Sequence, residues 1–164
     1  MTRRSRKPAQ QGFTLIELVA VLVIVAILAL LAEPRFFAVS TFSERGFFDD
    51  TLGAVRYAQK LAVASGCNVQ VSLSSTGYSL TQPSGCTSGA YTQPVPNPGT
   101  GEASYTGQAP SGVTLSSTLS PIVFDPLGQA ENSAGNVSSA TITVTGGQTR
   151  QINVVGETGF VYSS

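Results

Sequence analysis

A run of 20 residues near the amino terminus, positions 13–32, constrains this chain more than any other feature. The run is apolar or small except at Thr14 and Glu17. A helix rises about 1.5 Å per residue, so the run would extend roughly 30 Å, the thickness of the hydrocarbon core of a bilayer. The sequence therefore predicts a membrane-spanning helix. Four basic residues precede it, at positions 3, 4, 6 and 7. Because basic flanks stay in the cytoplasm, we expect the remainder of the chain outside it.

Glu17 places a charge inside this apolar run. An ionised carboxylate in a membrane costs on the order of a few kcal/mol, so such a residue usually has a partner or a function. Thr14 and Glu17 have the spacing of a capping box, in which each side chain satisfies a backbone N–H at the start of a helix. The spacing is therefore consistent with a capping role, and a second role in contacts between molecules remains open.

The residues around Glu17 carry a resemblance to a known family. The string Gly12-Phe13-Thr14-Leu15-Ile16-Glu17 resembles the processing site of type IV prepilins, the family of type IV pilus subunits and of the pseudopilins of type II secretion. The resemblance implies a leader of residues 1–12, cleavage between Gly12 and Phe13, and methylation of the new amino group on Phe13. It also implies that Glu17 meets the terminal amine of a neighbouring subunit and sets its register in a filament, a role suited to a buried ion pair.

The same resemblance implies the partners and the location. The partners would be the prepilin peptidase and methyltransferase, other pilin or pseudopilin subunits, the assembly platform of the inner membrane, and the membrane itself before assembly. The chain would cross the bacterial inner membrane once, with its head in the periplasm, and then enter a pilus or pseudopilus. Two other readings of the run are an ordinary secretory signal, although no clean A-x-A site occurs at 29–33, and an unprocessed anchor.

Charge and composition exclude several classes of function. Four of the nine basic residues lie in the leader, which leaves five against nine acidic residues, a net charge of −4 (5 − 9). We therefore do not expect nucleic-acid binding. Histidine is absent, which removes Ser-His-Asp and Cys-His catalysis and the commonest zinc ligand. Asp49 and Asp50 are adjacent on a predicted helix and point in different directions. We expect no enzyme activity, no metal and no cofactor.

The two cysteines, Cys67 and Cys86, predict a disulfide, because a pair of cysteines outside the cytoplasm is usually oxidised. The bridge would enclose residues 68–85. In the loop-entropy model, closing a loop of this length contributes roughly 3 kcal/mol.

A second helical segment follows the apolar run. Pro34 is expected to kink the helix, and a proline here is also frequent among type IV pilins. From 35 to 64 apolar residues recur at helical spacing, and Gly66 is a typical helix stop. The face of this segment that should cover a sheet is Phe48, Leu52, Val55 and Ala62. Five phenylalanines also cluster here, and they are expected either in the core or against helices of other subunits: Phe36, Phe37, Phe42, Phe47 and Phe48.

The rest of the chain predicts strands. Alternation indicates a hairpin of 68–73 with 78–80, and later strands are predicted at 113–115, 122–124, 141–145, 148–155 and 160–162, with a two-residue turn at Gly146 and Gly147. The Pro-rich segment 83–112 is predicted to be an exposed loop, where Tyr91 and Tyr105 are candidates for a partner surface. The fold class is α+β, a pilin-like fold in which residues 33–164 form a head: an amphipathic helix to about 65 packs on antiparallel sheet.

The head carries a second resemblance. Phe124-Asp125-Pro126-Leu127-Gly128, Gly156-Glu157-Thr158-Gly159-Phe160-Val161 and Arg56-Tyr57-Ala58 are similar to the pseudopilin H and FimT-type domain. Among its members, minor pilins of the mannose-sensitive haemagglutinin type are the most similar. The resemblance implies a structural minor subunit of a type IV pilus, or alternatively a type II secretion pseudopilin of the H type. A third class, DNA-uptake pilins, uses basic residues near the last strand, but residues 159–162 contain no arginine.

Overall fold

The computed structural model describes residues 14–164, with side chains at 14–29 and 42–164. The chain divides into two units, Met1–Val39 and Ser40–Ser164. In the described residues one helix, α1 (Leu15–Ser65), precedes ten strands. The leader 1–12 and Phe13 lie outside the described residues. Across the part of the chain that is described, no helix reaches the length and apolarity needed to cross a membrane.

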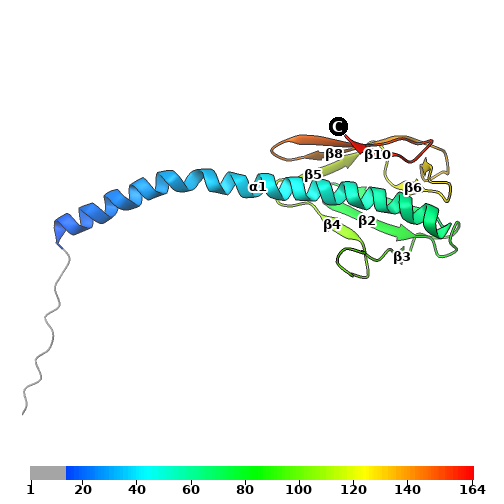
Figure 1. Ribbon diagram of the computed structural model, residues 1–164, viewed down its shortest axis with the longest axis horizontal. Coiled ribbons are helices and arrows are strands. Elements are labelled where there is room, and N and C mark those ends of the chain that lie inside the picture. The colour runs from blue at the N-terminus through cyan, green and yellow to red at the C-terminus, as the bar shows by residue number, and fades with distance from the viewer. Residues whose placement is uncertain (1–13) are drawn as a thin grey trace, which may run out of the picture. The chain divides into compact units, whose positions relative to one another are not determined.

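The strands of the head form two antiparallel sheets (Figure 1). The first sheet has the order β3-β2-β1-β6-β7, and β4 also pairs with β2. The second has the order β10-β9-β8-β5. The strands are β1 (Val69–Ser74), β2 (Gly77–Gln82), β3 (Gln93–Pro94), β4 (Thr106–Gln108), β5 (Thr114–Ser117), β6 (Ile122–Phe124), β7 (Ala130–Glu131), β8 (Ala140–Thr145), β9 (Thr149–Val154) and β10 (Val161–Ser163). The predicted α+β architecture, a helix packed on antiparallel sheet, is confirmed.

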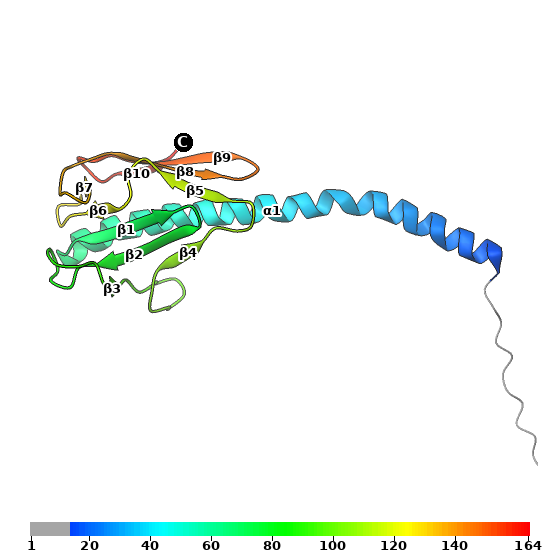
Figure 2. The ribbon, with the colours of Figure 1, turned by 180° about the vertical axis from the view of Figure 1, so that it is seen from behind.

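The second half of α1 packs on both sheets, which lie on the same side of it in Figures 1 and 2. Buried residues recur at intervals of three and four, the spacing of one helical face. This face contains Phe47, Phe48, Thr51, Ala54, Val55, Ala58 and Ala62. The predicted face is confirmed at Phe48, Val55 and Ala62, and Leu52 is partly buried beside it. All the buried side chains among the described residues lie within Ser40–Ser164, so this unit has its own core.

The helix ends and the first hairpin begins as the sequence predicts. Gly66 has a φ of 69° and donates its N–H to the carbonyl of Ala62 at 3.0 Å, which closes the last turn. In the hairpin, Ser74 pairs with Gly77. Gly77 has a φ of 153°, and a Cβ there would collide with the backbone oxygen of Gly107 on β4. A glycine is therefore required where β2 meets its neighbour.

The prediction that 83–112 is an exposed loop is wrong for part of the segment. Two short strands, β3 and β4, pair with successive parts of β2. Between them Val95 is fully buried and donates its N–H to Leu80 at 3.2 Å, and Tyr105 donates to Val95 at 2.6 Å. Pro94 is tolerated because β3 is a short edge strand. The Pro-rich composition concealed these pairings because they depend on an edge of β2 far from them in sequence.

The predicted two-residue glycine turn of the last hairpin is also wrong. Thr145 pairs with Thr149, so three residues, Gly146, Gly147 and Gln148, connect β8 to β9. The Gly146 N–H donates to the carbonyl of Gln148 at 3.2 Å. A contact from α1 determines this conformation, as described below. The prediction also missed β7, a two-residue strand that pairs with β6.

Candidate functional site

The amino-terminal candidate site is described from Thr14 onward; Gly12 and Phe13 lie outside the described residues. The hydroxyl of Thr14 accepts the N–H of Glu17 at 3.3 Å, which is one half of the predicted capping box. Glu17 is exposed, and within the described residues its carboxylate makes no hydrogen bond or ion pair. Thr14 therefore caps the helix, while the ion pair of Glu17 with a neighbouring subunit stays a prediction.

The start of α1 presents apolar side chains to solvent on every side. Between positions 15 and 28 the large apolar side chains are from 46% to 80% exposed. They are Leu15, Ile16, Leu18, Val19, Val21, Leu22, Val23, Ile24, Val25, Ile27 and Leu28. A helix that is apolar all round belongs either in a membrane or among other helices. This stretch is accordingly a surface that requires an apolar environment.

The kink predicted at Pro34 stays a prediction, because that side chain lies outside the described ones, as do Phe36 and Phe37. The other three phenylalanines separate into two groups. Phe47 and Phe48 are each 5% exposed and belong to the core of the head, whereas Phe42 is 80% exposed. Core packing thus explains two of the five, and Phe42 remains available for contacts with another molecule.

The predicted disulfide between Cys67 and Cys86 is present, with Cα atoms 4.5 Å apart. It joins the residue after the helix stop to the segment that follows β2. Beside it, the N–H of Asn68 donates to the carbonyl of Cys86 at 2.9 Å, and the Asn68 amide donates to the Tyr91 hydroxyl at 3.4 Å. Tyr91 therefore helps to close this end of the first hairpin.

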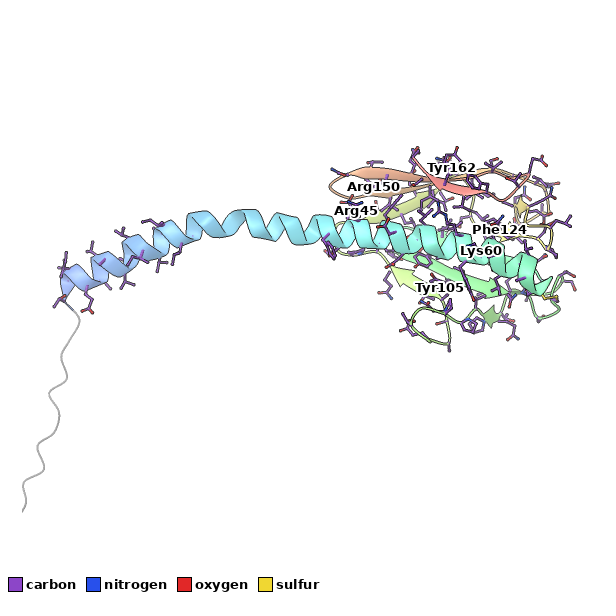
Figure 3. The ribbon with its side chains drawn as sticks, viewed as in Figure 1. Arg45, Lys60, Tyr105, Phe124, Arg150 and Tyr162 are labelled. Atoms are coloured by element: carbon purple, nitrogen blue, oxygen red, sulfur yellow. A yellow bond between two sulfur atoms is a disulfide. The ribbon has the colours of Figure 1, made fainter. Side chains whose placement is uncertain are left out.

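A buried acid that the sequence analysis overlooked connects α1 to the β8–β9 turn. Glu44 is 3% exposed, and its carboxylate accepts the N–H of Gly147 at 2.7 Å and that of Gln148 at 3.1 Å. Arg150, labelled in Figure 3, lies next to this turn. Its guanidinium is 5.7 Å from the ring centroid of Phe48. The available signal was position, since Glu44 lies four residues before Phe48 and therefore on the core face of the helix.

Two further side chains attach the helix to the second sheet. Arg56 Nε donates to the carbonyl of Val161 at 3.1 Å, and the Gln59 amide donates to the carbonyl of Thr158 at 3.1 Å. Together with Glu44, they attach three successive parts of α1 to the β8–β10 sheet and its loops. The sequence offered no pattern for these contacts, because each joins residues about 100 positions apart.

Tyr105, the second tyrosine proposed for a partner surface, packs against α1 and β2. Its ring centroid lies 5.5 Å from that of Tyr57 and 6.3 Å from that of Tyr78. Burial, and then the negative charge of Asp50, raise the pKa of the Tyr105 hydroxyl. The same two causes, with Tyr105 itself, raise the pKa of Tyr78. Both hydroxyls therefore stay protonated at neutral pH. Among the described residues, no group of three or more Cys, Asp or Glu side chains could hold a metal ion.

Comparison with known proteins finds one family model for the amino-terminal segment of the chain and another for the rest. A family model described as the prokaryotic N-terminal methylation motif matches residues 7–32, and one described as type II transport protein GspH matches residues 49–159. No individually curated protein shows significant sequence similarity to the chain.

Solved structures of two minor subunits share the fold. One is the type IV minor pilin FimU of Pseudomonas aeruginosa, with 11% identity over 76% of this chain and 91% of that chain and a TM-score of 0.53. The other is the minor pseudopilin EpsH from the type 2 secretion system of Vibrio cholerae, with 10% identity over 76% of this chain and 95% of that chain and a TM-score of 0.53. At these identities the likeness establishes the fold alone.

Proposed function

We propose that this chain, which belongs to the GspH family of type II transport proteins, is a minor subunit of a type IV pilus. Proteins of this family are structural subunits and not enzymes. Within the class of minor pilus subunits we propose the mannose-sensitive haemagglutinin type, to which the motifs at 124–128 and 156–161 are similar. The chain would be inserted in the inner membrane as a prepilin. It would then be assembled into a filament through its amino-terminal helix.

The observation that carries the proposal is the apolar surface at the start of α1. Large apolar side chains between Leu15 and Leu28 are 46% to 80% exposed, on every face of the helix. Burying a side chain of this size is worth about 1.5–3 kcal/mol. A surface made of eleven such side chains favours insertion among lipids first and among the helices of other subunits afterwards.

The methylation-motif match at residues 7–32 supports a proposal for maturation. We propose that residues 1–12 are a leader removed after Gly12, that the new terminal amine of Phe13 is methylated, and that residues 13–32 pass from the inner membrane into the filament core. Residues 33–164 then form a periplasmic head. In the filament, Glu17 would accept the charged amine of Phe13 from a neighbouring subunit, which sets the axial register.

A secretion pseudopilin of the H type is the second candidate. Two observations favour it: the family model is described as a type II transport protein, and EpsH shares the fold at the same TM-score as FimU. DNA uptake is the weakest of the three, because nine acidic residues face five basic ones after removal of the leader (5 − 9 = −4).

Mass spectrometry of filaments sheared from the cell surface separates these functions. A minor pilus subunit should be present in small amounts, and immunogold label should sit at few positions on long fibres. Abundant label along the whole fibre would indicate a major pilin instead. Absence from surface filaments, together with loss of protein export in a strain that lacks the chain, would establish the secretion function and contradict the pilus function.

The role of Glu17 has its own test. Glu17→Ala should be inserted and processed as the wild type is, yet should be missing from sheared filaments. Glu157→Ala removes an exposed acid from the head and is the matched control, which should be incorporated normally. Normal incorporation of Glu17→Ala would show that the carboxylate does not set the register.

A further inference from the structure

An open groove of about 640 Å³ lies between α1 and the segment that carries β4. On the helix side it is lined by Phe42, Gly46 and Asp50, and on the other side by Glu102 and Tyr105, among others. Figure 3 shows Tyr105 on this side of α1. All the lining residues belong to the unit Ser40–Ser164. The groove is therefore a feature of the folded head and is separate from the apolar surface at 15–28.

The groove contains a polar group without a partner. Tyr78 is only 6% exposed, and it lines the groove. Its ring and hydroxyl pack so closely on Gly107 that a Cβ on residue 107 would collide with the Tyr78 ring. Within the described residues this hydroxyl makes no hydrogen bond, and it is not among the buried polar atoms sealed from solvent. The hydroxyl is therefore open to solvent at the groove. The Tyr78 hydroxyl is thus positioned to bind a group that enters the groove.

The charged residues that line the groove are all acidic. Asp50 and Glu102 contribute two carboxylates, and no Lys or Arg is among the lining residues. In the described part of the chain Asp50 has no ion-pair partner, and its charge acts on the hydroxyls of both Tyr78 and Tyr105. Aromatic rings complete the lining, among them Phe42, which is 80% exposed, and Tyr105, whose ring centroid lies 6.3 Å from that of Tyr78. Ring faces and carboxylates together are the surroundings that attract an organic cation.

We propose that this groove binds a lysine or arginine side chain of a partner protein. The cationic head would lie between Asp50 and Glu102, and its aliphatic stem would lie against the ring of Tyr105. The Tyr78 hydroxyl would accept a hydrogen bond from the charged group. Amphipathic stems of this kind cover apolar surface while the charge meets its counter-ion. The proposal holds for a pilus subunit and for a secretion subunit alike.

An oligosaccharide is the competing occupant, since sugars also stack on aromatic rings. The unpaired carboxylates favour the cation: a neutral sugar would leave both negative charges uncompensated, whereas a basic side chain neutralises one of them. Charge complementarity of this kind also predicts that binding weakens as ionic strength rises.

The test uses the full-length protein in zwitterionic detergent micelles and a blocked (Gly-Arg)3 peptide, with NMR titration as the measurement. The ring signals of Tyr78 and Tyr105 should shift on addition of the peptide. Asp50→Asn should weaken binding at least fivefold. Asp49→Asn is the matched control: it makes the same change at the adjacent residue, which does not line the groove, and should leave binding unchanged.

Two further probes make the outcome decisive. The same peptide with citrulline in place of arginine has no charge and should not bind, and maltohexaose should not shift the tyrosine signals. Failure of the arginine peptide to bind, equal weakening by Asp49→Asn and Asp50→Asn, or preferential binding of maltohexaose would each overturn the proposal. Unchanged melting temperatures of both variants would establish that folding does not cause the difference.

Discussion

The carboxylate of Glu44 on α1 accepts the backbone N–H of Gly147 at 2.7 Å, a contact between residues 103 positions apart. A second N–H, that of Gln148, donates to the same carboxylate at 3.1 Å. Hydrogen bonds to a carboxylate are stronger than those between neutral groups. This pair therefore determines the conformation of the β8–β9 turn and its position against the helix.

Removal of this carboxylate should be one of the most damaging single changes in the head. Glu44→Ala removes the carboxylate that accepts two backbone N–H groups and should lower the free energy of unfolding by about 3 kcal/mol. Urea denaturation followed by circular dichroism measures the loss. Asp49→Ala, at an exposed position on the same helix, is the control and should change stability by less than about 0.5 kcal/mol. Equal effects of the two variants would contradict the structural role of Glu44.

Gly146, next to the two residues that Glu44 binds, should tolerate no side chain. A Cβ on Gly146 would lie 2.7 Å from Glu44 Oε2, so Gly146→Ala should destabilise the head by about 1–2 kcal/mol. The opposite is expected at Gly46, in the interior of α1, where a Cβ meets nothing within 4 Å. Gly46→Ala should stabilise by about 0.5–1 kcal/mol, because alanine favours helix. Thermal unfolding of both variants tests whether Gly146→Ala lowers the melting temperature and Gly46→Ala raises it.

The disulfide should contribute to the stability of the head. It closes the loop between Cys67 and Cys86, whose sequence separation is 19. The double variant Cys67→Ser with Cys86→Ser should lose about 3 kcal/mol, since the unfolded chain regains the entropy of an open loop. Denaturation of the wild type with and without a reducing agent gives an independent value. A double variant as stable as the oxidised wild type would show that the bridge does not contribute.

The pH dependence of stability should change when Glu131 is replaced. Burial, and then the charge of Asp125, raise the pKa of Glu131 in the folded state. The folded protein therefore binds more protons than the unfolded chain between the two pKa values, and its stability falls as pH rises through that interval. Glu131→Gln should remove this loss, with a higher melting temperature than the wild type at pH 7 and an equal one at pH 3.

The control for this experiment is Glu157→Gln, which changes an exposed glutamate and should shift the melting temperature equally at the two pH values. A lower melting temperature of Glu131→Gln at pH 7 would mean that the carboxylate makes a favourable contact that outweighs its burial.

Regular spacing is what made much of this fold predictable from sequence. The alternation of Val69 and Val71, the stop at Gly66 and the buried positions Phe48, Val55 and Ala62 are all local patterns, and the structure has them where the sequence predicts them. The disulfide followed from the presence of two cysteines and an expected location outside the cytoplasm. In each case a few neighbouring residues, or two cysteines, carry the whole signal.

Contacts between distant segments were not predictable in this way. β3 and β4 exist because an edge of β2 offers them partners. The three-residue turn after β8 exists because Glu44 reaches it from the helix. The groove likewise combines Asp50 of α1 with Tyr105 and Glu102, which lie more than 50 residues later. Composition indicated a loop there, since proline and glycine are typical of loops, and it gave no information on which edge the segment would meet.

Processing of the amino terminus is the event on which assembly as a filament subunit depends. The most direct test is mass spectrometry of the amino-terminal peptide of the mature, membrane-associated chain. The account predicts a peptide that begins at Phe13 with a methylated amine and lacks residues 1–12. An intact leader, or a mature chain that begins at any other residue, would contradict it.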